Sequence, residues 1–368
     1  MDRNGRVPTI YDVARVAGVS PSTVSRALAG QGQVSAPTAS RIKQAAVDLR
    51  YRPNAVARSL TVRQSNSLAV MLPDIANPFF PALVREVQLR AHGYGKTVLL
   101  CNTGGEPEAE IEYLEMLASQ QISGVVVMGL AASPNRVRRY LRAGMRMVAL
   151  DRRPSVGEIE SVQADHRLGS DLATTHLIEI GHREIGHIPG PRGISVAADR
   201  REGVLQALTR AGLSLGAGHE VRGDFSEASG YRAAEELIAG GGTFTAIVVG
   251  NDLMALGAMA ALRAAGIRVP EDVSVVGFDD IDLGRYATPA LTTVRQPLQL
   301  MAAAAVDLLL GVPPAEELDR SRIPVSLVVR ASTAPPGDGR WRRRDTFAKR
   351  TPGARDHHGR RVGSVEGV

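Results

Sequence analysis

The sequence has very little cysteine and no long hydrophobic run. Its one cysteine, Cys101, cannot form an internal disulfide or a cysteine-based zinc site. No stretch approaches the roughly 18 apolar residues of a membrane-spanning helix, and the first residues lack a signal-peptide core. We therefore expect a cytoplasmic protein with no membrane partner. The apolar residues Val98, Leu99 and Leu100 before Cys101 predict a buried thiol.

The positive charge of the chain is concentrated at its two ends. The 368 residues have a formal net charge of +6. Residues 1–63 carry ten Lys or Arg against three acidic residues, residues 335–368 carry nine against four, and the segment between them has a net charge of −6. A basic N-terminal segment is typical of a nucleic-acid-binding protein. The last segment is rich in Gly, Pro and Arg without periodicity, which predicts a disordered basic tail.

The first fifty residues predict short helices joined by a tight turn. Thr9 and Asp12 form a capping-box pattern, so a first helix should run to about Val16. After the turn, Ser20 is placed to cap a second helix. Pro21 then occupies the first helical position, where its missing N–H costs nothing.

The second predicted helix has a small, polar outer face. Helical spacing places Val24, Ala27 and Leu28 inward. The outward positions are Ser22, Ser25, Arg26 and Ala29. A third helix over about 36–49 should complete a small core.

From Ser67 onward, short apolar runs alternate with amphipathic helices. The runs are SLAVMLP, TVLLC, GVVVMG, RMVAL, EIGHIPG, TAIVVG and VSVVGF. Strands that are apolar on both faces and alternate with helices indicate a parallel sheet of βαβ units. Because these strands are too many for one small sheet, a break near Asp165 and a return near Arg295 predict two doubly wound lobes.

These segments resemble the lactose repressor and galactose repressor family of bacterial transcription factors. TIYDVARVAGVSPSTVSRAL and RYRPNAVARSL are similar to that family's helix-turn-helix and hinge. DIANPFF, VALDRR, GHREIGHIPG, VVGNDLMALGAM, VSVVGFDDID and LTTVRQP have counterparts in its effector domain, in the same order, from about Pro8 to Thr333. The resemblance implies an α/β fold with an N-terminal all-α helix-turn-helix head. A two-lobed, doubly wound effector domain like the periplasmic ribose-binding proteins should follow it.

The resemblance also implies domain boundaries and an assembly. We expect the head at 1–52, the hinge helix and linker at 53–65, the effector domain at 66–334 and the tail at 335–368. Lobe 1 should comprise about 66–164 and 296–322, and lobe 2 about 165–293 and 323–334. Palindromic operators imply a homodimer with two heads. The C-terminal region has no leucine heptad repeat that would join dimers into tetramers.

For the head, the resemblance assigns base reading in the major groove of operator DNA to Pro21, Ser22 and Arg26. Arg26 can donate two hydrogen bonds to guanine, worth roughly 1–3 kcal/mol of discrimination. Ser22 is less selective, and Pro21 offers only apolar contact. Positions similar to those that anchor the DNA backbone are Thr9, Tyr11, Ser20, Thr23 and Ser25.

For the hinge, the resemblance implies a short helix from Asn54 to Leu60 that forms on the operator. Two copies would meet in the minor groove, where Leu60 wedges between base pairs and Ala57 allows a close approach. By itself the segment NAVARSL is too short for a stable helix in water and also fits an ordinary linker.

For the effector domain, the resemblance implies a sugar site built from both lobes. Its residues are Asn77, Phe79, Phe80, Asp151, Arg152, Arg200, Phe225, Asn251, Asp279 and Gln296. Carboxylates and amides pair with adjacent hydroxyls, arginines donate in a fork, and aromatic faces cover the C–H side of a sugar ring. The set favours a ribose-like monosaccharide, with a hexose or a purine as alternatives, and it includes no cofactor and no metal. Singly, these residues also fit helix caps, turns or the core.

Two other classes of protein fit less of the sequence. A sugar-converting enzyme would need catalytic groups, but His182 and His187 flank a predicted strand start and have no second cluster of metal ligands. A DNA-binding architectural protein would leave the polar effector set unexplained. We therefore predict a non-enzymatic transcriptional repressor whose effector changes the angle between the lobes and so rearranges the hinge.

Overall fold

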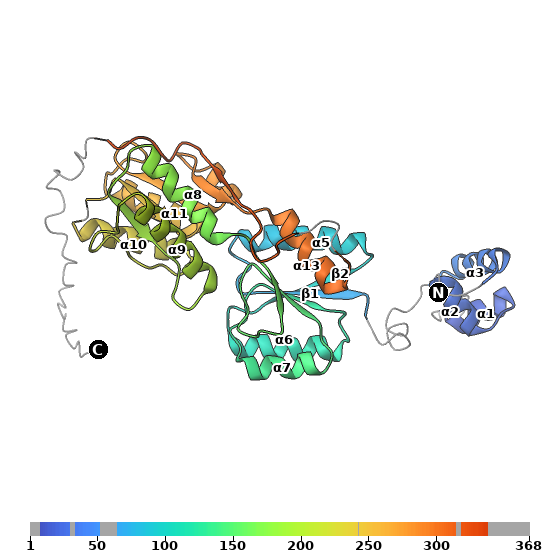
Figure 1. Cartoon of the computed structure of the whole chain (residues 1–368). Helices are drawn as coiled ribbons and strands as arrows, with labels where there is room; N and C mark the ends of the chain where they lie inside the picture. Colours follow the sequence, from blue (N-terminus) through green and yellow to red (C-terminus); the bar gives the residue numbers. More distant parts are fainter. Residues whose placement is uncertain (1–7, 30–33, 52–64, 242, 314–317, 338–368) are drawn as a thin grey trace, which may run out of the picture.

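The computed structural model describes residues 8–29, 34–51, 65–241, 243–313 and 318–337. These residues form a helical head and a two-lobed body (Figure 1). The predicted hinge residues Asn54, Ala57 and Leu60 lie outside the described residues, as does the predicted tail from residue 338 onward.

The described part of the head contains three helices, and local capping explains where the first two begin. They are α1 (Ile10–Ala17), α2 (Pro21–Ala29) and α3 (Ala36–Asp48). The Asp12 carboxylate accepts a hydrogen bond of 2.9 Å from the backbone N–H of Thr9, the residue before α1. Ser20 Oγ accepts one of 3.2 Å from the N–H of Thr23. The predicted start of the second helix at Pro21 is therefore confirmed.

The body contains two five-stranded sheets, one in each lobe. Lobe 1 holds β1 (Ser67–Leu72), α5 (Phe79–Gly93), β2 (Thr97–Asn102), α6 (Pro107–Ser119), β3 (Val125–Val127), α7 (Pro134–Arg142), β4 (Met147–Leu150), β5 (Glu160–Val162) and α13 (Leu298–Leu310). Lobe 2 holds α8 (His166–Glu179), β6 (Ile185–Ile188), α9 (Ser195–Arg210), α10 (Glu227–Ala239), β7 (Ala246–Val249), α11 (Asp252–Ala264), β8 (Ser274–Asp279), α12 (Asp282–Arg285), β9 (Thr292–Arg295) and β10 (Ser326–Val328). The strand orders are β2-β1-β3-β4-β5 and β10-β9-β8-β7-β6. All neighbouring strands are parallel except β9 and β10, which confirms the predicted doubly wound α/β fold.

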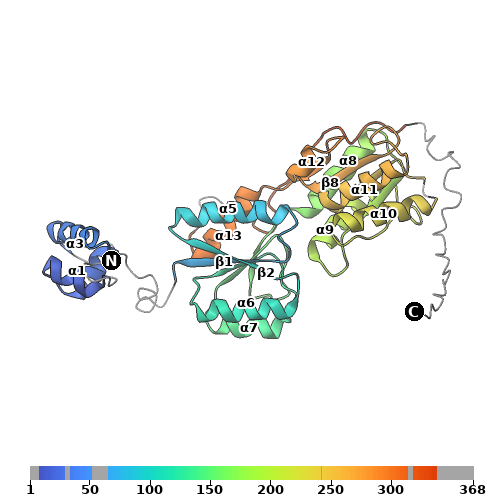
Figure 2. The same cartoon turned by 180° about the vertical axis from the view of Figure 1, so that it is seen from behind.

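Helices cover both faces of each sheet (Figures 1 and 2). In lobe 1, α5 and α13 pack on one face, and α6 and α7 on the other. In lobe 2, α8 and α9 pack on one face of the sheet, and α10 and α11 on the other. All six residues of β8 are consequently buried, as expected for a strand covered on both faces. None of the described helices is long and apolar enough to cross a membrane.

Strand β2 departs from the prediction of strands buried on both faces. It lies at the edge of its sheet, and Leu99 and Leu100 are 38% and 41% exposed. Cys101 is buried, which confirms the predicted buried thiol. The apolar run at 98–101 thus reflects an edge strand with an exposed apolar surface.

The chain passes between the lobes three times. It leaves lobe 1 after β5, returns after β9 to form α13, and crosses again before β10. Ala164 in the first crossing and Ile323 in the third form a β-bridge. The crossings bring His166 and Gln296 to the junction between the lobes.

Candidate functional site

The first turn of α2 presents a cluster of hydroxyl groups to solvent. Ser20 Oγ lies 2.8 Å from both Ser22 Oγ and Thr23 Oγ1. Ser22, Ser25 and Arg26 are exposed. The N-terminus of a helix carries a partial positive charge that attracts anions such as phosphates. This face therefore combines an anion-attracting helix end with side-chain donors.

The other predicted DNA-binding residues in the described head differ in their exposure to solvent. Tyr11 is exposed, whereas Thr9 and Pro21 are half-buried. The Thr9 hydroxyl donates to Asp12 over 2.7 Å. The Arg26 Nε donates to the Ser22 carbonyl over 3.3 Å, which lays the base of the guanidinium along α2.

A buried polar network joins predicted effector residues at the junction between the lobes. Asp279 Oδ1 accepts hydrogen bonds from Arg200 Nη2 at 3.0 Å and from Gln296 Nε2 at 2.8 Å. Arg200 Nη1 donates to the Gly250 carbonyl at 2.6 Å. The Arg200 guanidinium carbon lies 3.7 Å from the centre of the Phe278 ring, a cation–π contact. Arg200 is thus fixed on three sides.

His166, which was not among the predicted effector residues, connects this network to lobe 1. Its Nδ1 accepts from Arg200 Nε at 3.4 Å. Its Nε2 lies 3.3 Å from the Asp151 carbonyl oxygen and 3.4 Å from Asp151 Oδ1. The only sequence signal for His166 is its position directly after Asp165, where the chain first crosses between the lobes.

The two buried carboxylates of the network have opposite pKa shifts. Burial by itself would raise the pKa of Asp151, but the hydrogen bond from His166 and the charges of Arg200 and Arg152 outweigh it and lower that pKa. For Asp279, burial prevails over the attraction of Arg200, and the pKa is raised. The site therefore holds carboxylates of different basicity on its two sides.

Aromatic and amide groups of the predicted set lie beside this polar network. The Arg152 guanidinium carbon lies 5.8 Å from the centre of the Phe80 ring, and Phe80 packs edge-on against Phe79. Asn251 caps α11 by accepting from the Met254 N–H, and its amide donates to the Phe225 carbonyl. Asn251 therefore has the helix-cap role that its sequence position also allowed. Asn77 accepts from the Phe79 N–H at the start of α5.

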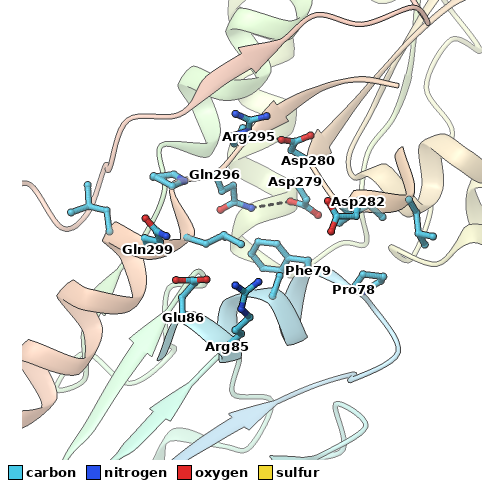
Figure 3. Close-up of a pocket in the computed structure, with 16 residues that line it drawn as sticks. Pro78, Phe79, Arg85, Glu86, Asp279, Asp280, Asp282, Arg295, Gln296 and Gln299 are labelled. Carbon is cyan, nitrogen blue, oxygen red and sulfur yellow. Dashed lines mark hydrogen bonds and ion pairs between the residues drawn. The ribbon is translucent and has the colours of Figure 1, made fainter. Parts of the chain in front are cut away.

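A cavity of about 550 Å³ opens between the start of α5, the loop after β8 and the start of α13 (Figure 3). Phe79, Asp279 and Gln296 from the predicted set line it, together with Arg85, Glu86 and Asp280. Figure 3 shows Phe79 below the Asp279–Gln296 hydrogen bond. The other seven predicted residues do not line this cavity.

Three buried polar atoms of the predicted set form no hydrogen bond of good geometry with any described residue. They are Arg152 Nε, Gln296 Oε1 and Asp151 Oδ1, whose near contact is His166 Nε2 at 3.4 Å. An unpaired buried polar group costs free energy, on the order of 1–3 kcal/mol, and such groups commonly face a ligand or water. These atoms comprise a charged acceptor, a charged donor and a neutral acceptor, which suit hydroxyl groups.

The loop that presents Asp279 is strained and held from several sides. Asp279 and Asp280 are consecutive non-glycine residues with φ of 112° and 54°, a backbone conformation that typically costs on the order of 1–3 kcal/mol per residue. The fully buried Asp252 accepts from the Ile281 N–H at 2.9 Å and from Thr293 Oγ1 at 2.5 Å. Burial and the nearby Asp279 raise the pKa of Asp252 well above its usual value. Asp252 was not among the predicted residues, and it ties the loop after Asp279 to β9.

A partly exposed contact ties the lobes together beside the network. The Arg153 N–H donates to Ser195 Oγ at 3.1 Å. Arg153 Nη2 lies 2.9 Å from Asp199 Oδ2 on α9. These contacts join the end of β4 in lobe 1 to α9 in lobe 2.

The two histidines that raised the question of a metal site have structural partners. His182 contacts Thr245 Oγ1, Ser274 Oγ and the Ala334 carbonyl, which docks the last described segment onto lobe 2. His187 donates from Nδ1 to the Val248 carbonyl at 2.9 Å. The described ranges contain no group of three or more His, Cys, Asp or Glu placed to hold a metal ion.

Known sequences resemble this chain in both of its parts. Residues 9–54 match the family described as bacterial regulatory proteins, lacI family, and residues 174–333 match a periplasmic binding protein-like domain. The ribose operon repressor of Halalkalibacterium halodurans is 39% identical over 327 residues, covering 88% of this chain and 97% of that protein. The transcriptional repressor PurR of Edwardsiella ictaluri is 36% identical over 331 residues, covering 89% and 97%.

Solved structures extend the likeness to the fold. The lac repressor dimer bound to operator and the anti-inducer ONPF has a TM-score of 0.78 and 33% identity, covering 89% of this chain and 100% of that one. A LacI family regulator from Enterococcus faecium with bound ribose has a TM-score of 0.65 and 31% identity, covering 73% and 99%.

Proposed function

The chain belongs to the lacI family of bacterial regulatory proteins, and we propose that it binds a palindromic operator as a homodimer under the control of a ribose-like pentose. Its relatives are named as transcriptional repressors and not as enzymes, so a sugar-converting enzyme is not our proposal. The effector acts without a cofactor.

The observation that carries the effector proposal is the set of unpartnered polar atoms at the lobe junction. Asp151 Oδ1, Arg152 Nε and Gln296 Oε1 are buried and supply both donors and acceptors. Neighbouring hydroxyls of a sugar can accept from the guanidinium while donating to a carboxylate or an amide oxygen. A polyol therefore carries donors and acceptors complementary to all three atoms.

Two similarities support a pentose among the possible effectors. A ribose operon repressor is 39% identical to this chain, and a structure with bound ribose covers 73% of it. The likeness to PurR supports a purine as the second candidate. Both would occupy the same junction, so the effector class is decided by binding measurements.

An exposed apolar surface on lobe 1 supports the homodimer. Leu99 and Leu100 on the edge strand β2 are partly exposed, as are Leu89 and Tyr94 at the end of α5. Large exposed apolar side chains on neighbouring elements are the kind that protein interfaces cover. The operator complex of the similar lac repressor is a dimer, and two heads would match the two halves of a palindrome.

Calorimetry of the full chain with ribose, glucose and adenine tests the effector. We expect heat with ribose and at least tenfold weaker binding by the Asp151→Ala variant, because a hydroxyl loses a charged acceptor. Asp171→Ala, at a carboxylate paired with Arg210 within lobe 2, is the matched control and should bind as the parent does. Heat with adenine alone would replace the pentose with a purine.

Selection of DNA from a random library by the full chain tests the operator. We expect the enriched sequences to form an inverted repeat, since a two-fold dimer presents its heads symmetrically. Enrichment of a single half-site or a direct repeat would contradict the proposal that a homodimer binds a palindromic operator.

A further inference from the structure

His166 lies where the two halves of the proposed site meet. Its side chain is 1% exposed. It contacts Asp151, which follows β4 in lobe 1, and Arg200, which projects from α9 in lobe 2. Its ring is also tilted against Phe278 at a centroid distance of 5.7 Å. Among the described residues, no other side chain forms hydrogen-bond contacts with both Asp151 and Arg200.

The partners of His166 determine where its proton sits. A guanidinium has only donors, so His166 Nδ1, 3.4 Å from Arg200 Nε, must be the acceptor and carry no hydrogen. The hydrogen of the neutral ring is then on Nε2. Nε2 lies 3.3 Å from the Asp151 carbonyl and 3.4 Å from its carboxylate, both of which are acceptors. This arrangement requires a neutral imidazole.

We propose that neutral His166 is a positioning residue that couples Asp151 to Arg200 across the lobe boundary and makes effector binding sensitive to pH. This inference rests on the proposed effector site. A proton added at Nδ1 would turn the acceptor into a donor facing another donor, and the link to Arg200 would be lost. The lobe-2 half of the site would then no longer be aligned with the lobe-1 half.

The charged groups around His166 set the direction of this effect. Asp151 faces it from the end of β4, Arg200 from α9 and Asp279 from the end of β8, while Asp165 and Arg167 flank it on the chain. The two facing carboxylates favour an added proton, and the guanidinium opposes it. The hydrogen bond to Arg200, which only the neutral ring can accept, decides the outcome. Acidification should therefore weaken effector binding.

The proton position can be measured without any effector. The full chain labelled with ¹⁵N-histidine contains eight histidines, and the resonance missing in His166→Gln identifies the ring. Long-range ¹H–¹⁵N correlation at pH 7.5 should give an Nε2–H tautomer. An Nδ1–H tautomer or an imidazolium at that pH would overturn the proposal.

The coupling is measured by ribose calorimetry between pH 8.0 and 5.5. We expect the parent to bind at least threefold more weakly at pH 5.5 than at pH 7.5. His166→Phe removes both hydrogen bonds and should bind at least tenfold more weakly at pH 7.5. His166→Gln keeps a donor and an acceptor but does not titrate, so it should bind more tightly than His166→Phe at pH 7.5, with a flat pH profile.

His92→Gln is the matched control, because His92 is exposed on α5 and far from the network in sequence. It should retain the pH profile of the parent. Parent-like binding by His166→Phe, or a parent-like pH profile in His166→Gln, would refute the coupling. If the parent gives no heat with ribose at any pH, the proposed effector fails, and the tautomer measurement decides the role of His166 by itself.

Discussion

Arg200 and Asp279 form an ion pair of 3.0 Å in which the two side chains are only 5% and 6% exposed. Both residues belong to lobe 2, but each also contacts a segment that crosses to lobe 1: Arg200 contacts His166, and Asp279 contacts Gln296. The pair therefore contacts the two crossing segments that contain His166 and Gln296. Its integrity should matter for stability as well as for ligand binding.

Replacing Arg200 by Met should destabilise the protein by about 3–5 kcal/mol, because it leaves the Asp279 carboxylate buried without its counter-ion. Urea unfolding measures the effect. Arg268→Met is the control, since Arg268 pairs with Asp272 on the surface, where such pairs contribute about 0–1 kcal/mol. The double variant Arg200→Met, Asp279→Leu should recover much of the loss. Equal costs for the two single Arg variants would show that the buried pair has no special role.

Replacing Arg26 by Ala should remove most discrimination between the selected operator and a variant altered at the contacted guanine. The expected loss is about 1–3 kcal/mol of specificity, with weak, salt-sensitive binding retained. Fluorescence anisotropy at several salt concentrations measures both quantities. Arg41→Ala, at an exposed arginine on α3, serves as the control and should preserve specificity. Unchanged operator preference in Arg26→Ala would remove α2 as the reading element.

The Arg153–Asp199 contact should favour the closed arrangement of the lobes by a small, salt-dependent amount. Arg153 is 54% exposed and Asp199 13%, so the coupling should be about 0.2–1 kcal/mol. A double-mutant cycle on ribose affinity, with each residue changed to Ala, measures it at low and high salt. The Arg210–Asp171 pair joins two helices of lobe 2 and should give no coupling to ribose binding. A zero coupling for Arg153 and Asp199 at low salt would mean that this contact does not bias closure.

Local sequence signals predicted the parts of the fold that depend on neighbouring residues. Ser20 and Pro21 located the start of α2 because capping involves residues two or three apart. Apolar runs located strands such as β1 and β8, which are covered on both faces. The same signal could not distinguish β2, because an edge position is decided by strand order rather than by composition.

Several contacts within the candidate site join residues that are far apart in the chain, which local patterns do not encode. His166 and Arg200 are 34 residues apart, and Asp252 and Thr293 are 41 apart. Their roles arise only when the helices and strands of lobe 2 pack together. Asn251 illustrates the converse, since its helix-cap role was visible locally, whereas its bond to Phe225 was not.

His187 should make the folded state sensitive to acid. It is buried on β6, its Nε2 has no hydrogen-bond partner among the described residues, and burial lowers its pKa to about 4. An unfolded histidine titrates near 6.5, so the unfolded chain binds more protons than the folded one between these values. The stability that neutral His187 contributes is therefore complete above about pH 6.5 and is lost as the pH falls toward 4. The total loss should be about 3 kcal/mol.

Urea unfolding at pH values from 7.5 to 4.5 measures this loss in the parent and in His187→Gln. The glutamine amide can still donate to the Val248 carbonyl but does not titrate, so the variant should lose less stability on acidification. Part of the pH dependence should remain, because burial also lowers the pKa of His176 and His182. The difference between the two profiles isolates His187. Parallel profiles would mean that His187 binds its proton as readily in the folded chain as in the unfolded one.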